Sequence, residues 1–124
     1  MSATGNQQNS TGEGVLSRLD MLLEHYFASL RSLKYGTPSV AYCAAELELS
    51  ANYFGSLVKR ETGISARDYI MEKLFAEAKS RILSREKNIN EIAYELGFRY
   101  PQHFSRSFKK LVGESPKKYG QIHL

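Results

Sequence analysis

The sequence has little of what a secreted protein, a membrane protein or a large enzyme requires. Its 124 residues hold one cysteine, so no disulfide can form within the chain, and a reducing cytoplasm is the expected location. No apolar run approaches about 18 residues, which argues against a membrane span, and residues 1–14 do not resemble a signal peptide. Strand-like alternation of polar and apolar residues persists nowhere, so the expected fold class is all-α.

Catalytic and metal-binding patterns are also missing from the sequence. It contains no paired carboxylates, no nucleophile beside a base and no phosphate-binding loop, so neither an enzyme activity nor a cofactor is expected. His25, His103, His123 and Cys43 follow no metal-ligand spacing, so no metal site is expected. Cys43 falls on the apolar face of a short predicted helix, where a buried small side chain is commoner than a reactive thiol.

The most informative feature that is present is a motif that occurs twice, 50 residues apart. The first copy contains Phe54, Val58, Lys59, Arg60, Gly63, Ser65 and Tyr69, and the second contains Phe104, Phe108, Lys109, Lys110, Gly113, Ser115 and Tyr119. A short apolar helix pattern precedes each copy, at residues 40–47 and 89–97. A short helix, a turn and a basic helix form a helix-turn-helix. Two such units predict a protein that reads two stretches of a DNA groove.

The remaining segments connect and support these two units. Residues 1–14 are rich in small polar residues, which predicts a flexible tail or an interdomain linker ahead of a domain over residues 15–124. Apolar residues then recur at helical spacing and predict one amphipathic helix that ends near Gly36. These residues are Leu16, Leu19, Leu23, Tyr26, Phe27, Leu30 and Leu33. The first helix-turn-helix is predicted over about 39–63, the linker helix over about 65–86 and the second helix-turn-helix over about 89–112.

Cap and turn residues support these boundaries. Ser39 and Ser65 are the predicted N-caps of the helices that begin just after them, and Gly63 is the predicted C-cap of the first basic helix. Gly97 ends the first helix of the second unit, where the chain must bend, so it is predicted as a turn residue. The second unit is therefore expected to begin its basic helix shortly after Gly97.

A long helix from Ala66 to about Arg85 is predicted between the two units, with a length of roughly 27 Å. We expect it to act as a strut that sets their separation. Tyr69 near its start and Tyr119 at the equivalent place in the second copy are predicted to be packing residues rather than stacking platforms.

Positive charge is concentrated in residues 97–124. The chain has a formal net charge of +4. In this segment Glu114 is the one acid against Arg99, Arg106, Lys109, Lys110, Lys117 and Lys118. A basic stretch is often only a solvated face, but its place within a helix-turn-helix favours phosphate as the partner.

The second basic helix has two chemically different faces. On a helical wheel Phe108 and Leu111 fall within about 40° of Phe104, which predicts a buried stripe. Long polar side chains face the other way, where Arg can pair with guanine and Gln with adenine. The predicted base-reading residues are Gln102, His103 and Arg106, and the predicted phosphate-binding residues are Ser105, Lys109 and Lys110.

The first basic helix has the same pattern with shorter outward side chains. Phe54, Leu57 and Val58 are predicted to face inward. The predicted base-reading residues are Asn52, Tyr53 and Ser56, and Lys59 and Arg60 are predicted to hold the phosphate backbone. Because the first helix has no outward Arg among its base-reading residues, we expect the second unit to dominate sequence specificity.

These motifs resemble the C-terminal signature of the AraC/XylS family of transcription regulators. Residues 89–98, 101–110 and 113–119 carry the resemblance, which covers about residues 39–119. It implies seven helices, arranged as two homeodomain-like lobes joined by a long central helix, with the recognition helices in successive major grooves. By position, the family's base-reading sites fall on Asn52, Gly55 and Ser56 in the first lobe and on Pro101, Gln102, His103 and Arg106 in the second.

The resemblance implies that the chain binds double-stranded promoter or operator DNA as part of a bacterial regulator, with family precedent favouring an activator. It also suggests RNA polymerase as a partner in the full-length context, and the isolated domain is expected to be monomeric. Members usually carry a separate effector or dimerisation domain. The alternative is a helical protein-interaction module that binds an acidic partner. The outward Gln102 and Arg106 argue against it, because a protein interface favours apolar or aromatic residues in central positions.

Overall fold

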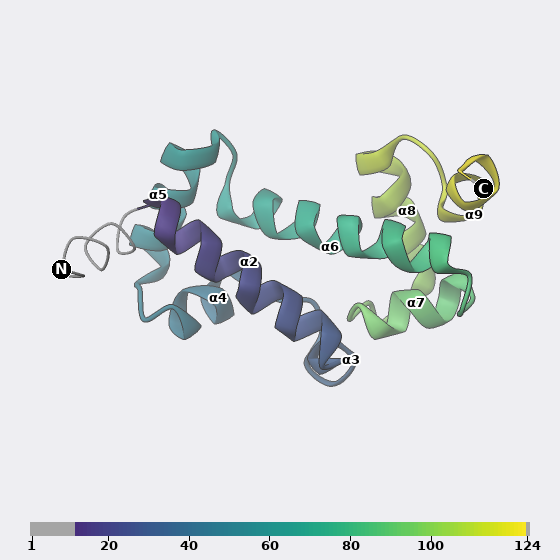
Figure 1. Cartoon of the computed structure of the whole chain (residues 1–124), viewed down its shortest axis with the longest axis horizontal. Helices are drawn as coiled ribbons and strands as arrows, with labels where there is room; N and C mark the ends of the chain where they lie inside the picture. Colours follow the sequence, from purple (N-terminus) through teal and green to yellow (C-terminus); the bar gives the residue numbers. More distant parts are fainter. Residues whose placement is uncertain (1–11, 124) are drawn as a thin grey trace, which may run out of the picture. The chain divides into compact units, whose positions relative to one another are not determined.

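The computed structural model describes residues 12–123, and all the regular secondary structure in that range is helical. The all-α fold class is therefore confirmed. The helices, shown in Figure 1, are α2 (Gly12–Ala28), α3 (Arg31–Tyr35), α4 (Val40–Glu46), α5 (Ala51–Thr62), α6 (Ala66–Ser84), α7 (Ile89–Glu95), α8 (Pro101–Val112) and α9 (Pro116–Ile122). Across the described residues, every helix is too short or too polar to span a bilayer.

The chain divides into two compact units, each with one helix-turn-helix. The described residues of unit 1 are 12–25 and 38–73, and those of unit 2 are 26–37 and 74–123. Unit 1 thus contains the pair α4 and α5, and unit 2 contains α3, the pair α7 and α8, and α9. Helices α2 and α6 each contribute residues to both units.

The core of unit 1 is built mainly from aliphatic side chains. The apolar positions of α2 that recur at helical spacing are buried, as are the inward residues of α4 and α5. The buried apolar residues are Val15, Leu19, Leu23, Cys43, Ala44, Leu47, Phe54, Leu57, Val58, Ala66 and Ile70. Each large aliphatic side chain removed from water contributes roughly 1.5–3 kcal/mol, so this packing holds the small unit together.

The core of unit 2 contains a cluster of aromatic rings beside its aliphatic residues. The ring centroid of Phe75 on α6 lies 6.0 Å from that of Phe104 and 5.9 Å from that of Phe108, both on α8. Phe98, in the turn before α8, lies 5.3 Å from Phe104 in an edge-on arrangement. Edge-to-face and offset pairs at such distances are the arrangements that aromatic rings prefer. The cluster therefore fixes α8 against α6 and against the turn that precedes it.

The segment before the first helix-turn-helix differs from the single helix that the sequence predicts. Helix α2 ends at Ala28, and the short helix α3 comes next, so the described residues contain eight helices where the resemblance implied seven. Leu30 adopts a left-handed conformation with φ 59°, which breaks the helix and changes the helical phase of the residues after it. Leu30 and Leu33 are consequently 39% and 56% exposed, while Ser32 is buried and donates a hydrogen bond to the carbonyl oxygen of Glu95.

The predicted tail over residues 1–14 falls largely outside the described residues. Residues 1–11 belong to that part, whereas Gly12–Gly14 form the start of α2. The described helix thus begins three residues before Val15, where the helical spacing of apolar residues starts.

Candidate nucleic-acid interface

The first helix-turn-helix has a capping residue at each boundary. The side chain of Ser39 accepts a hydrogen bond from the backbone N–H of Tyr42 at 3.0 Å, and that of Ser50 accepts one from the N–H of Tyr53 at 3.1 Å. At its other end α5 stops at Gly63, which has φ 83°. The predicted N-cap at Ser39 and C-cap at Gly63 are therefore confirmed. Together the caps make α5 a separate helix with a defined start.

The second helix-turn-helix is capped by different residues. The side chain of Asn88 accepts a hydrogen bond from the N–H of Glu91 at 2.8 Å, and the Glu91 carboxylate accepts one from the N–H of Asn88 at 2.9 Å. This reciprocal pair is a capping box at the start of α7. Helix α8 begins with Pro101, whose fixed φ suits the first helical position, and ends at Gly113 with φ 101°.

The turn between α7 and α8 requires glycine at position 97. Gly97 has φ 102°, a conformation that side chains rarely adopt. A Cβ built on it would lie 2.4 Å from the carbonyl carbon of Gly36 and 2.4 Å from the backbone nitrogen of Thr37. The prediction of Gly97 as a turn residue is confirmed, and the close approach adds a second reason for it.

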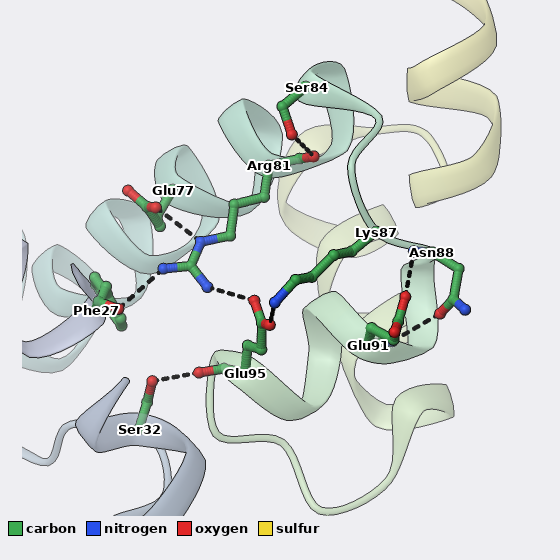
Figure 2. A network of polar contacts seen from close by, with 9 residues as sticks. All are labelled: Phe27, Ser32, Glu77, Arg81, Ser84, Lys87, Asn88, Glu91 and Glu95. Atoms are coloured by element: carbon green, nitrogen blue, oxygen red, sulfur yellow. Dashed lines mark hydrogen bonds and ion pairs between the residues drawn. The ribbon is translucent and has the colours of Figure 1, made fainter. Parts of the chain in front are cut away.

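A polar network centred on Arg81 holds α7 in place, as Figure 2 shows. From α6 the Arg81 guanidinium donates to Glu77 at 2.8 Å, to Glu95 of α7 at 3.0 Å and to the carbonyl oxygen of Phe27 at 3.0 Å. Lys87 pairs with the second carboxylate oxygen of Glu95. The side chains of Arg81 and Glu95 are only 17% and 13% exposed, so water weakens this ion pair little. The network fixes the helix on which α8 packs.

Helix α8 has the two faces that a recognition helix requires. Phe104 and Phe108 are fully buried. The predicted base-reading residues Gln102, His103 and Arg106 are exposed, as are the predicted phosphate-binding residues Lys109 and Lys110, while Ser105 is half-buried. The ring of His103 lies edge-on to that of Tyr100 with centroids 5.3 Å apart. The long polar side chains thus lie together on the surface of one helix.

The predicted burial of Leu111 is wrong, because 52% of this residue is exposed. Leu111 lies in the last turn of α8, just before the chain leaves the helix at Gly113. The helical wheel places Leu111 on the same side as Phe104. Near the end of α8, however, the described residues of unit 2 leave that side partly open to solvent. The position 50 residues earlier is Glu61, a residue suited to solvent.

The outward side chains of helix α5 have less reach than those of α8. Asn52, Tyr53 and Ser56 are exposed, as are Lys59 and Arg60. Gly55 lies between them in the middle of the helix, and a Cβ added to it would meet nothing within 4 Å. The guanidinium of Arg60 lies 3.4 Å from the carboxylate of its neighbour Glu61, a loose and exposed contact. All the residues that the sequence predicts for this face therefore lie on the surface.

The cations of the two outer faces remain available to an anionic partner. Over residues 12–123, Lys59, Arg106, Lys109 and Lys110 take part in no ion pair. Arginine and lysine that are exposed and lack a carboxylate partner attract phosphate through a sequence-independent interaction.

The residues with a possible chemical role outside these faces belong to the packing. Cys43 is fully buried, and burial raises the pKa of its thiol to about 12, so it stays protonated at neutral pH. The hydroxyl of Tyr69 donates to Asp20 at 2.7 Å, and the ring of Tyr119 lies 5.6 Å from that of Phe108. The burial predicted for Cys43 is confirmed, and each tyrosine makes a side-chain contact within its own unit.

Helical-wheel reasoning omits polar residues that flank the recognition helices. Arg99 and Tyr100 are exposed directly before α8, and Lys34 is exposed on α3. The one available signal was the basic residue just ahead of Pro101. No wheel could connect it to α3, because tertiary contacts bring the two segments together, namely those between α3 and α7 and the approach of Gly36 to Gly97.

Comparisons with known proteins agree with this geometry. The family described as "Helix-turn-helix domain" matches residues 43–122. The probable transcriptional regulator LumQ of Photobacterium leiognathi is 32% identical over 86% of the chain, and the uncharacterized HTH-type transcriptional regulator YtdP of Bacillus subtilis is 37% identical over 63% of it. The chain spans 42% of LumQ and 10% of YtdP, and so less than half of either relative.

Solved structures share the fold. The C-terminal domain of AraT, a response regulator from Geobacillus stearothermophilus, matches with a TM-score of 0.73 at 28% identity, covering 87% of this chain and 84% of that one. The DNA-binding domain of the global transcriptional factor AdpA, solved in complex with a target DNA, matches with a TM-score of 0.70 at 20% identity, covering 90% and 91%. At that identity the AdpA match shows the fold alone.

Proposed function

Because the chain belongs to the AraC/XylS family of helix-turn-helix transcription regulators, as the C-terminal DNA-binding domain, we propose that it binds a specific double-stranded promoter or operator site through two recognition helices. Helix α5 of unit 1 and helix α8 of unit 2 each enter a major groove, and the two grooves are successive. The whole regulator acts on transcription, with activation the favoured direction.

The observation that carries the proposal is the composition of α8. Phe104 and Phe108, which are one helical turn apart, are fully buried. Gln102, His103 and Arg106 are exposed on the same helix. A helix held by its apolar face with long polar side chains free to reach outward fits the major groove, which admits an α-helix. The outward charge disfavours the alternative of a protein-interaction module, whose centre would be apolar or aromatic.

The proposed roles divide by chemistry. Arg106 pairs with the O6 and N7 atoms of guanine, and Gln102 pairs with adenine. His103 contributes a further contact at the start of α8, and Asn52, Tyr53 and Ser56 read the other half of the site. Ser105 and the cationic pairs at the ends of the two helices, Lys59 with Arg60 and Lys109 with Lys110, bind phosphates and fix the register of the protein on the duplex.

The remaining partners belong to the longer regulator. We propose that RNA polymerase contacts it at the promoter and that it works in the bacterial cytoplasm, where promoter DNA lies. The isolated domain is proposed to be monomeric, with a separate effector or dimerisation domain supplying the signal. Catalysis and cofactors play no part in this proposal.

Selection of bound duplexes from a random pool, at a stated salt concentration, tests the proposal. We expect a bipartite site of about 15–20 base pairs, the scale of two groove contacts one helical turn apart. Affinity for the selected site should exceed that for random DNA by roughly 10³-fold or more. Recovery of no preferred sequence, with equal affinity for every duplex, would contradict sequence-specific binding and leave only electrostatic attraction.

A further inference from the structure

A groove of about 390 Å³ lies in unit 2 between α3 and the turn that joins α7 to α8. Lys34 and Tyr35 line it from α3, Tyr94 lines it from α7, and Arg99 lines it from the turn. None of these residues belongs to the recognition-helix faces described above. The groove is therefore a feature of the surface that the proposed function leaves unused.

The walls of the groove are held by one side-chain hydrogen bond and one close backbone approach. Ser32 of α3 donates to the carbonyl oxygen of Glu95 at the end of α7, as Figure 2 shows. On the other wall the backbone of Gly36 lies so close to Gly97 that a side chain there would overlap it. The groove is thus formed before any partner arrives, which lowers the entropic cost of binding.

The charge of the groove favours an anionic occupant. Among the residues that line it, Lys34 and Arg99 are cationic and no carboxylate is present. Neither cation forms an ion pair with any residue in the range 12–123. The carboxylate of nearby Glu95 is bound to Arg81 and Lys87. The ammonium of Lys34 lies 5.3 Å from the ring centroid of Tyr35, and neither cation has an acidic partner among the described residues. Two such cations at one concave surface raise the local concentration of anions.

The exposed rings of the groove add hydrogen-bond donors. Tyr35 is 64% exposed and Tyr94 is 46% exposed, so both hydroxyls can reach a partner. Tyrosine hydroxyls, like arginine and lysine, donate to phosphate oxygens in protein–DNA interfaces. The phosphates of a nucleic-acid strand could accept hydrogen bonds from these two cations and two hydroxyl groups.

The groove is continuous with the start of the proposed recognition helix. Arg99 and Tyr100 immediately precede Pro101, the first residue of α8, and the ring of Tyr100 contacts that of His103. Arg99 is therefore three residues from Gln102 and lies on the side of α8 that faces the groove's lining residues.

We propose that this groove binds the sugar-phosphate backbone of the DNA that flanks the half-site read by α8. Lys34 and Arg99 hold its phosphates, and α3 thereby extends the footprint of unit 2 beyond the helix-turn-helix. The inference rests on the proposed function, because it needs a duplex already engaged by α8. An acidic protein segment is the competing occupant, and the test distinguishes the two.

The test compares the salt dependence of binding to a selected site for Lys34→Ala, Arg99→Ala and the double variant. Each single substitution should reduce the slope of log affinity against log salt by about 1, and the double should reduce it by about 2, with specificity unchanged. Arg99→Lys should keep the wild-type slope, because it retains the charge. Arg31→Ala is the matched control: it removes an exposed cation from the same short helix outside the groove and should leave the slope unchanged.

A second measurement varies the DNA instead of the protein. Trimming the selected duplex beyond the half-site read by α8 should lower the affinity of the wild-type protein several-fold. The affinity of the double variant should hardly change. Unaltered slopes in both single variants, with trimming equally harmless to all proteins, would overturn the proposal and favour an acidic protein as occupant. If the wild-type protein itself showed no site preference, the proposed function would fail, which is a different result from loss of the groove contact alone.

Discussion

The two helix-turn-helix units share their plan but differ in what they present to a partner. Each has an N-capped first helix, a turn with one residue at positive φ and a second helix that ends at a left-handed glycine. In unit 1 the residue at positive φ is Glu48, and the second helix starts at a Ser50 cap. In unit 2 the residue at positive φ is Gly97, and the second helix starts at Pro101 after Tyr100. The comparison indicates that caps and buried faces preserve the fold while the outward residues are free to diverge.

The units also differ in how their first helix is supported. In unit 2, α7 is tied to α6 by the charged network of Arg81, Glu95 and Lys87. Among the described residues, α4 of unit 1 has no ion pair at all and relies on buried Cys43 and Ala44. The first helix of the motif in unit 2 therefore depends more on charge, and that in unit 1 depends more on apolar packing.

The largest expected effect comes from breaking α6, one of the two helices that contribute residues to both units. Ala78 is fully buried in α6, and proline there removes a backbone hydrogen bond and clashes with the preceding turn, at a cost of about 3 kcal/mol or more. If α6 sets the separation of the two units, as the sequence predicts, Ala78→Pro should also lose the two-half footprint. Denaturant unfolding and footprinting measure the two effects.

The matched control for that experiment is Ala78→Gly, which keeps the backbone N–H and should cost about 1 kcal/mol. Its footprint should cover both halves of the site. A folded Ala78→Pro protein that protected both halves at full affinity would show that the continuity of α6 is not needed.

The next effect should fall on unit 2 alone. Arg81→Met removes three hydrogen bonds to partly buried groups and leaves Glu95 with Lys87 as its one cationic partner, so we expect a loss of about 2–3 kcal/mol in unfolding free energy. Hydrogen exchange should speed up in α7 more than in α5. Arg67→Met, at an exposed position of the same helix, is the control and should change little. Equal loss of protection in both units would argue against a local role for the network.

Base reading should then separate the two recognition helices. Arg106→Ala should weaken the selected site by about 1–3 kcal/mol and relax the preference at one base pair, because a bidentate contact is lost. Ser56, the equivalent position of α5, has less reach, so Ser56→Ala should cost less. Lys109→Ala should weaken all sequences similarly and lower the salt slope by about 1. A larger effect at Ser56 than at Arg106, measured by titration of single-base variants of the site, would reverse the predicted dominance of unit 2.

The smallest expected effect is a gain in stability. Gly55 lies in the interior of α5, and a methyl group there meets no atom within 4 Å, so Gly55→Ala should stabilise the protein by roughly 0.5–1 kcal/mol. Denaturant unfolding with an unchanged m value measures it. Ser105→Ala in α8 is the matched comparison and should gain less, since serine is already a better helix former than glycine. If Gly55→Ala destabilised the free protein, the open space around this position would be in doubt.

Local features of the fold were predictable from the sequence because they depend on neighbouring residues. A serine before an apolar helix pattern identified the cap at Ser39, and glycine after the last periodic residue identified the end at Gly63. The alternation of Phe104 and Phe108 with polar residues identified the buried side of α8. The two caps depend on contacts within about one helical turn. The apolar period of α8 indicates which side is buried, although Phe75 of α6 is what covers it.

The features that were not predictable depend on contacts between distant parts of the chain. The break at Leu30 interrupts apolar spacing typical of a continuous helix, and the spacing gives no sign of it. Ser32 meets Glu95 across 63 positions, and Arg81 meets Glu95 across 14. The burial of a wheel position such as Leu111 also depends on whether another element reaches that far. Outward residues of the candidate interface could be named in advance, whereas the groove beside α3 could not.

The close approach of Gly97 to Gly36 bears on how far the domain can be shortened. A truncated protein that started at Ser39 would keep both helix-turn-helix pairs, yet it would remove Gly36 and Thr37 from beside the second turn and Ser32 from beside α7. The backbone around Gly97 and the carbonyl oxygen of Glu95 would then be exposed to solvent just before the recognition helix of unit 2. We therefore expect a fragment that keeps residues 26–37 to hold unit 2 together better than one that starts at Ser39, although these residues lie ahead of both motifs in the chain.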